Sequence, residues 1–458
     1  MRINSKITAE SLRAKIEKMF GLSAEKIFAL DKTWKPENGS PVFTVKGKYT
    51  ARGWTEWTQG FQFGSALLQY DAMGEAEFLA RGRTATENLM ASHVSHVGVH
   101  DHGFNNISTY GSLRRLILES KAKGDASFCD LALKVSGAIQ AARWTRVENG
   151  EGFIYSFNGP HSLFIDTMRS LRSLALAHQL GHFLMGEHDE KISLLDRLIE
   201  HGRTTARFSI YYGEQRDAYD RRGRTAHESI FNTIDGRYRC PNSQQGFSPF
   251  TTWTRGLAWA SCGFAEQLEF LRTRPEEEFQ QIGGRKGVEE TFLKAATATA
   301  DFYIENSCAC GVPMWDTGAP NLSRLGDYLN NPADPFNEWE PVDSSAAAIA
   351  AQGLLRLAKY LAGARSRRPV RYDYRQAGLT ILNTLLEKPY LSTDGKHQGL
   401  LLHSVYHRPN GWDHIHKGQK VPNGESSMWG DYHLREVALM VLREMRKEPY
   451  LTFFSPVS

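Results

Sequence analysis

The sequence predicts an all-α fold built from six helical hairpins. Apolar residues recur every three or four positions in about twelve stretches of the 458-residue chain, which is the periodicity of amphipathic helices. A weak internal repeat indicates that the helices come in similar pairs, because Trp-Thr-Gln-Gly-Phe at 57–61 resembles Trp-Thr-Arg-Gly-Leu at 253–257. Repeated helix pairs form a solenoid or close into a toroid. Since no linker rich in Pro, Gly or Ser divides the chain, we expect one closed domain over residues 1–458.

Capping residues mark the starts of several predicted helices. Thr8, Thr252 and Asp343 each stand directly before an apolar-periodic stretch. The best strand signal is a hairpin at 229–239, whose Asp235-Gly236 dipeptide is favoured in tight hairpin turns. The twelve helices are expected near residues 8–20, 57–72, 75–92, 107–121, 126–144, 164–183, 187–206, 254–273, 287–305, 343–362, 371–386 and 430–447.

Three long irregular stretches, 208–252, 306–342 and 392–429, separate these helices. Long loops in a compact domain are usually functional. These three are rich in His, Trp, Asp and Gly, so we expect the functional site where they converge.

The composition excludes several classes of protein. With 41% hydrophobic and 23% charged residues, the chain resembles a soluble globular protein, and no apolar run reaches the ~20 residues of a membrane span. A net charge of +4 is too small for a nucleic-acid surface. The first residues lack a signal-peptide apolar region, and five cysteines without framework spacing fit reduced thiols. We therefore expect a cytoplasmic protein that binds neither membrane nor nucleic acid.

The phrase from Trp253 to Trp259, preceded by Gln245, predicts a site for an acidic sugar. Arg255 lies between the two tryptophans, and arginine grips carboxylates through two parallel hydrogen bonds. Tryptophan offers a flat apolar wall to a sugar ring. The alternative is that both tryptophans belong to the core, which is the commoner reason for helical aromatic spacing.

Two aspartates are candidates for acid–base chemistry. Asp101 lies between His100 and His102 before a glycine, and Asp166 follows an apolar run at a helix start. Apolar surroundings raise a carboxyl pKa, so such a group can act as a general acid. Paired carboxylates are the usual equipment for cleaving glycosidic bonds. The alternatives are a helix-capping aspartate and a solvated His-Asp-His turn.

Other catalytic motifs are missing from the sequence. We find no Gly-x-Ser-x-Gly, phosphate-binding glycine loop or dinucleotide fingerprint, which disfavours serine hydrolases, ATP enzymes and nicotinamide enzymes. His178 and His182 have the spacing of a zinc pair, but the intervening glutamate is absent. We therefore expect no metal and no cofactor.

A series of short phrases, in the same order, resembles the unsaturated glucuronyl hydrolases (glycoside hydrolase family 88) and the related unsaturated rhamnogalacturonyl hydrolases. The likeness spans roughly residues 50–445. The matching phrases lie at 57–61, 70–75, 100–104, 164–168, 227, 244–247, 253–259, 312–316, 343–350, 401–407 and 428–432.

The resemblance implies an (α/α)6 toroid whose long loops form the active-site cleft. It also implies an unsaturated uronate-containing oligosaccharide as substrate, the product of a polysaccharide lyase. In the family's reaction a general acid, which Asp166 matches, protonates carbon 4 of the vinyl ether. Water then adds at carbon 5, and the hemiketal opens to release the remaining sugar.

The resemblance assigns roles to the other candidates by position. Asp101 matches a second carboxylate that accepts hydrogen bonds from sugar hydroxyls, with His100 beside it. Arg255 is the favoured partner of the substrate carboxylate, with a brace behind the site as its alternative role. The remaining subsite residues implied are His227 and Gln245, with Trp57, Trp253 and Trp259 as aromatic walls.

Three departures concern substrate preference. Phe157 begins the phrase Phe-Asn-Gly-Pro where family members often carry Trp-Gly-Pro, and the stretches 208–223 and 321–342 look extended. The arginines at 216, 221 and 222 would meet an anionic aglycone or belong to a solvated loop. The alternatives to glucuronyl hydrolysis are a rhamnogalacturonyl or ulvan-type substrate, a sugar epimerase or isomerase, and a non-catalytic carbohydrate-binding toroid. We expect a monomer or homodimer.

Overall fold

The computed structural model describes residues 1–53, 56–363 and 369–454. A helix lies at each predicted position, with shifted ends. The first helix runs on to Asp31, well past the predicted end. The predicted helix at 164–183 begins only at Thr167, because residues 162–164 form a strand. The helix expected from 187 begins at Leu194, because a small hairpin precedes it.

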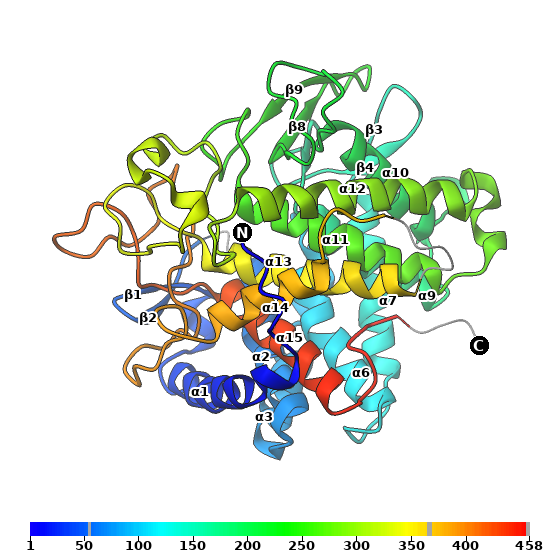
Figure 1. Ribbon diagram of the computed structural model, residues 1–458. Helices are drawn as coiled ribbons and strands as arrows, with labels where there is room; N and C mark the ends of the chain where they lie inside the picture. The colour runs from blue at the N-terminus through cyan, green and yellow to red at the C-terminus, as the bar shows by residue number, and fades with distance from the viewer. Residues whose placement is uncertain (54–55, 364–368, 455–458) are drawn as a thin grey trace.

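In the described part of the chain, the contacts between six inner helical segments close into a ring, and each segment follows an outer helix in the order that the colours of Figure 1 trace. Around the ring, α2 contacts α5, α5 contacts α8, α8 contacts α11, α11 contacts α13, α13 contacts α15, and α15 returns to α2. The predicted toroid is therefore confirmed. The inner segments are α2 (Gln59–Met73), α5–α6 (His102–Asn106 and Ser112–Leu118, joined by a π-helical turn), α8–α9 (Thr167–Ser170 and Arg172–Gln179), α11 (Thr254–Arg272), α13 (Ser344–Ala362) and α15 (Met428–Met445).

The outer helices are amphipathic, whereas the inner ones are buried almost all round. In α10, Leu194, Leu195, Leu198 and Ile199 face inward, and charged residues lie between them. The outer helices are α1 (Arg13–Asp31), α3 (Ala76–Leu89), α7 (Ser127–Ala142), α10 (Leu194–Phe208), α12 (Arg285–Asn306) and α14 (Tyr374–Leu385); α4 (Ala91–Val94) is a short extra turn.

Glycines let three inner segments approach closely near the predicted site. A Cβ on Gly60 of α2 would lie 2.4 Å from the Asn105 Cα of α5. A Cβ on Gly103 of α5 would lie 2.1 Å from the Ser170 carbonyl oxygen of α8. No side chain fits such gaps, so these glycines set how near the starts of α5 and α8 lie to each other.

Short strands occupy the loops. The predicted hairpin is present as β8 (Glu228–Phe231) and β9 (Tyr238–Asn242), although its turn is longer than two residues. β5 (Ser162–Phe164) adds a third strand to β8. The other pairs are β1 (Pro41–Val45) with β2 (Lys48–Ala51), β3 (Trp144–Arg146) with β4 (Gly152–Ile154), and β6 (Leu184–Met185) with β7 (Lys191–Ile192).

Two of the three predicted caps are present. The Asp343 carboxylate accepts from the N–H groups of Ser345 and Ala346, and the Thr8 hydroxyl accepts from the Ser11 N–H. Thr252 does not cap α11, because Trp253 holds the N-cap position and the Thr252 hydroxyl donates to the Thr225 carbonyl.

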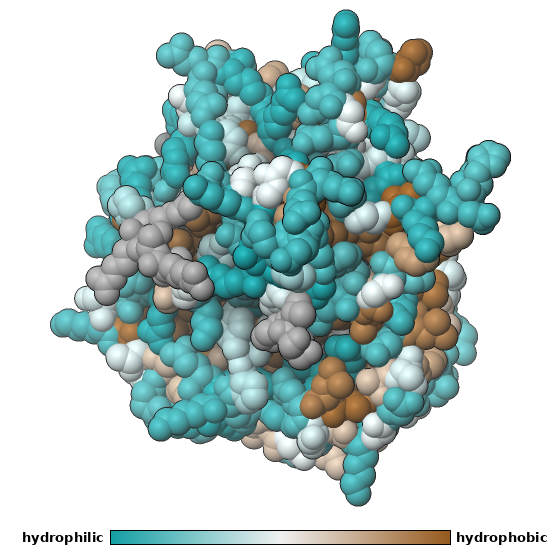
Figure 2. Space-filling view, turned by 90° about the vertical axis from the view of Figure 1, so that its right-hand side faces the viewer, coloured by the Kyte–Doolittle hydropathy of each residue, from teal (hydrophilic) through white to brown (hydrophobic). Residues whose placement is uncertain are grey.

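The surface seen in Figure 2 is mostly hydrophilic, with apolar groups scattered among polar ones. None of the helices in the described part of the chain combines the length and hydrophobicity that a bilayer span needs.

Candidate active site

The three-stranded sheet and two helix starts bring the predicted catalytic residues together. Asp166 lies between the end of β5 and the start of α8, and His227 directly precedes β8. The Ile165 N–H donates to the His227 carbonyl at 3.0 Å, so Asp166 and His227 lie at the same edge of the sheet. Asp101 directly precedes α5, which contacts α8.

One imidazole nitrogen serves both aspartates. His100 Nε2 lies 3.2 Å from Asp166 Oδ1 and 3.4 Å from Asp101 Oδ1. His100 is fully buried, and each aspartate keeps 7% of its surface exposed. Neither carboxylate caps the helix that it precedes. The structure thus disfavours both alternatives, the capping aspartate and the solvated turn.

Burial and charge act differently on the two carboxyls. Burial raises the pKa of Asp101 to about 6, against the opposing charges of His100 and Arg143. Burial also acts to raise the pKa of Asp166, but the hydrogen bond and charge of His100 outweigh it and hold that pKa below its ordinary value. The pKa of His100 is raised, because the two carboxylates together outweigh its desolvation.

These pKa shifts favour an ion pair between the His100 imidazolium and the Asp166 carboxylate, next to Asp101, which is more easily protonated. The expectation from sequence made Asp166 the acid. The lowered pKa of Asp166 and the raised pKa of His100 favour the proton on His100, so an acid role for Asp166 requires a transfer from that neighbour.

His227 offers a hydrogen-bond donor beside this pair. Its Nδ1 accepts from the N–H groups of Gln244 at 2.9 Å and Gln245 at 3.2 Å, which places the ring proton on Nε2. Burial lowers the pKa of His227 to about 3, so the ring is neutral. Its buried Nε2 has no hydrogen-bond partner among the described residues, so it is available to a ligand.

Both terminal nitrogens of the Arg255 guanidinium are occupied by protein groups. Its Nη1 donates to Asp343 Oδ2 at 2.8 Å and to the Val405 carbonyl at 2.6 Å. Its Nη2 donates to Gln245 Oε1 and to the Tyr406 carbonyl, both at 2.8 Å. With 1% of its surface exposed, Arg255 fits the role of brace and not that of direct partner to a substrate carboxylate.

The three predicted aromatic walls divide into different roles. Trp57 is half-buried, and its ring stacks on that of Trp429 at 5.0 Å between centroids. Trp253 is 3% exposed and packs against the His227 ring at 4.6 Å. Trp259 is 2% exposed and lies between Phe104 and the ring of His433, which favours a place in the core over a place in the sugar-binding wall. The core alternative holds for Trp259.

Several residues of the site were not among the predicted ones. Phe157 is 48% exposed, and its ring stacks on the His100 ring at 6.0 Å. An aromatic face is therefore present one residue before Asn158, the position that the tryptophan of the family phrase Trp-Gly-Pro matches. Trp429 and Tyr406 complete the surroundings of Arg255. Trp429 and Tyr406 lie in two of the phrases that resemble the family, which was the signal that the sequence offered. Those phrases do not show which residues contact Arg255.

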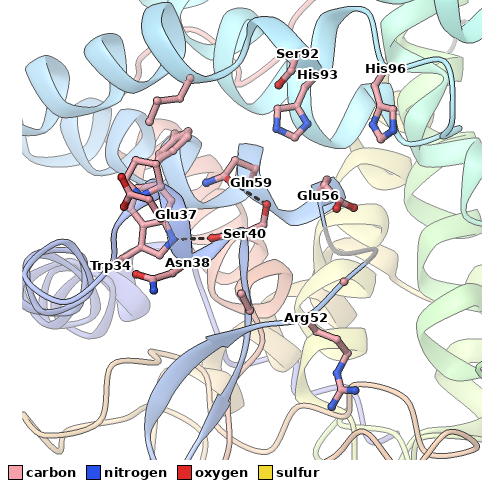
Figure 3. Close-up of a pocket in the computed structure, with 16 residues that line it drawn as sticks. Trp34, Glu37, Asn38, Ser40, Arg52, Glu56, Gln59, Ser92, His93 and His96 are labelled. Carbon is pink, nitrogen blue, oxygen red and sulfur yellow. Dashed lines mark hydrogen bonds between the residues drawn. The ribbon is translucent and has the colours of Figure 1, made fainter.

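A cleft of about 700 Å³ lies between the segment around residues 34–40 and the region of α4 (Figure 3). Trp34 and Asn38 line one side, and His93 and His96 come from the region of α4. Asp101, His100 and Asp166 do not line it. It is connected to them through α5, because His102 Nε2 bonds the His96 carbonyl at 2.9 Å.

The other predicted anion and metal candidates are used internally. Arg216 donates to the carbonyls of Arg207 and Phe208, and Arg222 pairs with Asp301 at 2.7 Å. His178 Nε2 lies 2.9 Å from Glu278 Oε2, so its partner is a carboxylate on another segment.

Comparison with known proteins finds several with similar sequences. No family model matches the chain. An unsaturated glucuronyl hydrolase of Formosa agariphila is 23% identical over 397 residues, 83% of this chain and 78% of the relative. The same kind of enzyme from Bacillus sp. strain GL1 is 24% identical over 406 residues, 86% of this chain and 89% of the relative. The chain is thus similar to unsaturated glucuronyl hydrolases over most of its length.

Solved structures of these relatives share the fold. An unsaturated glucuronyl hydrolase described as specific for heparin aligns with a TM-score of 0.71 at 20% identity, covering 96% of this chain and 99% of that one. The Bacillus sp. GL1 enzyme aligns with a TM-score of 0.68 at 21% identity, covering 95% and 98%. The (α/α) toroid is therefore common to this chain and its relatives.

Proposed function

We propose that the chain is a glycoside hydrolase that removes the non-reducing-end Δ4,5-unsaturated uronic acid from lyase-generated oligosaccharides. The observation that carries this proposal is the pair Asp101 and Asp166 sharing His100 at the loop end of the toroid. The relatives support it, since several are named unsaturated glucuronyl hydrolase or unsaturated chondroitin disaccharide hydrolase.

The proton for carbon 4 comes from the His100–Asp166 pair. In the free site the proton is on His100, and Asp166 is the anion. A bound sugar excludes water, and a desolvated ion pair is less favourable than its neutral form. The proton therefore moves from Nε2 to the Asp166 carboxyl, which protonates carbon 4 and then, as carboxylate, takes a proton from the water that attacks carbon 5.

The neighbouring residues orient the uronate during this reaction. The free Nε2–H of His227 donates to an acidic or hydroxyl oxygen of the sugar. Asp101, when ionised, accepts from sugar hydroxyls. Arg255 fixes Gln245 and the loop carbonyls at 405 and 406, so it shapes the subsite without touching the substrate.

The aglycone is proposed to include glycosaminoglycan sugars. One solved relative is described as specific for heparin, and the Bacillus sp. GL1 enzyme as responsible for glycosaminoglycan degradation. Phe157, exposed over His100, gives the sugar next to the uronate an aromatic face.

The decisive experiment follows the ultraviolet absorbance of the unsaturated uronate. The protein is mixed with lyase-generated disaccharides from chondroitin, hyaluronan, heparin, gellan, rhamnogalacturonan and ulvan. A loss of absorbance with a glycosaminoglycan product supports the proposal. Asp166→Asn should lower kcat by about 10²–10⁴-fold while binding is kept. A wild-type rate in that variant, or a flat signal with every disaccharide, would overturn the proposal.

We also infer that the protein works in the cytoplasm as a monomer or homodimer. Five free cysteines fit a reducing compartment. Light scattering after size exclusion distinguishes a 51.6 kDa particle from one of twice that mass. Fractionation of the source cells tests the compartment, and recovery outside the cytoplasm would contradict it.

A further inference from the structure

We propose that His414, His416 and Glu425 bind one Zn²⁺ ion, which fixes the loop that carries the Arg255 contacts. One nitrogen from each histidine and one carboxylate oxygen lie within 4.8 Å of one another. This set is independent of the hydrolase function proposed above, and the ion takes no part in the reaction. The sequence contains the signal as His-Ile-His at 414–416, which the search for zinc spacing at His178 and His182 overlooked.

The geometry is close to that of a zinc site. His416 Nε2 lies 3.2 Å from Glu425 Oε1, and the two histidine rings stand 4.7 Å apart at 82°. Zinc bonds to histidine and carboxylate measure about 2.0–2.2 Å, so tetrahedral ligand atoms are roughly 3.4 Å apart. One pair already has this separation. The third ligand atom, from His414, lies within 4.8 Å of the other two, and water would supply the fourth position.

Two buried polar atoms of the cluster lack a hydrogen bond. Within the described part of the chain these atoms are His414 Nε2 and Glu425 Oε1, and the group near Glu425 Oε1 is His416, itself one of the three proposed ligands. A buried polar atom without a partner costs free energy, and native proteins rarely keep two side by side. A cation between them satisfies both.

The other oxygen of Glu425 is held in place. Glu425 Oε2 accepts from the Thr44 hydroxyl and from the Gly47 N–H at 3.1 Å, and His397 Nε2 lies 3.5 Å away. Such outer contacts orient a metal-binding carboxylate and leave its second oxygen for the ion. Two imidazoles with one carboxylate favour Zn²⁺ over the oxygen-seeking Mg²⁺ and Ca²⁺.

The ion would join two parts of the loop at 403–426. The Ser404 N–H donates to the Glu425 carbonyl at 3.1 Å, and Asp413 accepts from the Tyr406 and His407 N–H groups. The carbonyls of Val405 and Tyr406 accept hydrogen bonds from Arg255. The proposed zinc ligands therefore belong to the same loop as the segment that Arg255 binds. Zinc would therefore stabilise the loop and act on catalysis only by positioning.

The test measures zinc on the full, untagged chain. The protein is stripped with a chelator, dialysed, and titrated with Zn²⁺ against a chromophoric competitor, and bound metal is counted by mass spectrometry. We expect one Zn²⁺ per chain, a higher Tm with zinc, and no such effect from Mg²⁺ or Ca²⁺. Co²⁺ in the same site should give the visible bands of tetrahedral coordination.

Three variants locate the ion. His414→Ala and His416→Gln should each weaken zinc binding by at least about 100-fold, since even outer partners contribute 10–100-fold. His182→Ala, in the competing histidine pair, should bind zinc like the parent chain. Circular dichroism confirms that each variant is folded, and His416→Gln keeps a polar side chain should the alanine variant fail to fold. Absence of stoichiometric zinc, or equal affinity in the His416→Gln chain, would overturn the proposal.

Discussion

At the residue scale, His100 decides how the two carboxyls share their protons. A single nitrogen between Asp101 and Asp166 stabilises one anion strongly and the other less. The result is two chemically identical groups whose pKa values are pushed apart, which is how an active site assigns acid and base roles. Phe157 and Phe164, which pack on the His100 ring, keep it in place.

The pH dependence of catalysis should report both groups. As the pH rises through about 6, Asp101 loses its proton and gains its role as acceptor for sugar hydroxyls, so kcat/KM should increase. At higher pH, above the raised pKa of His100, the imidazolium is lost and kcat/KM should fall. His100→Gln should lower kcat by about 10²–10⁴-fold and abolish the alkaline fall. An unchanged alkaline limb in that variant would show that His100 is not the proton source.

Arg255→Lys separates a brace from a substrate contact. A lysine cannot make the four hydrogen bonds of the guanidinium, so the loop at 405–406 should loosen. We expect kcat/KM to fall together with Tm, because the lysine ammonium keeps the charge opposite Asp343 but cannot replace the forked hydrogen bonds to Gln245 and the two loop carbonyls. Asp343→Asn should reproduce both effects. Loss of kcat/KM at constant Tm in the lysine variant would instead favour direct contact with the substrate.

At the scale of elements, a buried ion cluster joins the inner helices. Arg169 of α8 donates to Glu266 of α11 and to Glu436 of α15, the latter at 3.1 Å. Arg356 of α13 completes the set by pairing with Glu269 of α11 at 2.7 Å. Burial acts against each charge, but the arginines lower the pKa of Glu436 to about 2. These ion pairs specify which inner helices are neighbours and how each helix is rotated about its axis. The rest of the contacts between these helices involve apolar or small residues.

Removing one charge from this cluster should be costly. Glu436→Gln leaves Arg169 and Arg172 short of a counter-charge in a fully buried place, so unfolding free energy should drop by about 3–5 kcal/mol. Glu444→Gln on the same helix is the matched control. Its partner Arg375 is exposed, so a change of about 0–1 kcal/mol is expected. Urea unfolding measures both, and equal effects would contradict the role of the cluster.

At the scale of the whole molecule, buried histidines govern stability against acid. Burial lowers the pKa of His201, His227 and His433 to about 3. It lowers the pKa to about 4 for another four: His93, His102, His403 and His407. Below pH ~6.5 these histidines therefore bind protons in the unfolded chain but stay neutral in the folded chain.

Stability should consequently be full above pH ~6.5 and decline as the pH falls towards about 4. Buried carboxyls whose pKa is raised act in the opposite direction and offset part of this decline; for Asp101 and Asp413 burial raises the pKa to about 6. Thermal unfolding between pH 8 and 4.5 measures the slope. His201→Gln, whose amide oxygen can still accept from the Ile154 N–H, should make the decline shallower. A constant Tm from pH 7.5 to 5 would refute this explanation.

Much of the fold follows from sequence because helix periodicity is local. The apolar spacing at 254–273 and 343–362 placed α11 and α13 to within a residue or two. It misplaced the starts of α8 and α10, where short strands intervene, because a three-residue strand has too little alternation to be recognised. The single-domain organisation stays a prediction.

By itself, the sequence determined the all-α class, the six hairpins and the likeness to glucuronyl hydrolases, and it predicted Asp101, His100, Asp166 and His227 as site residues. Motifs name residue types, and local spacing sets helices. Only the tertiary structure decided that His100 stands between the carboxyls, that Arg255 is consumed by Asp343 and two carbonyls, and that Trp259 is core. These outcomes depend on which distant segments pack together. The pKa and the exposure of a side chain are set by its neighbours in the folded chain, and a local sequence pattern does not specify those neighbours.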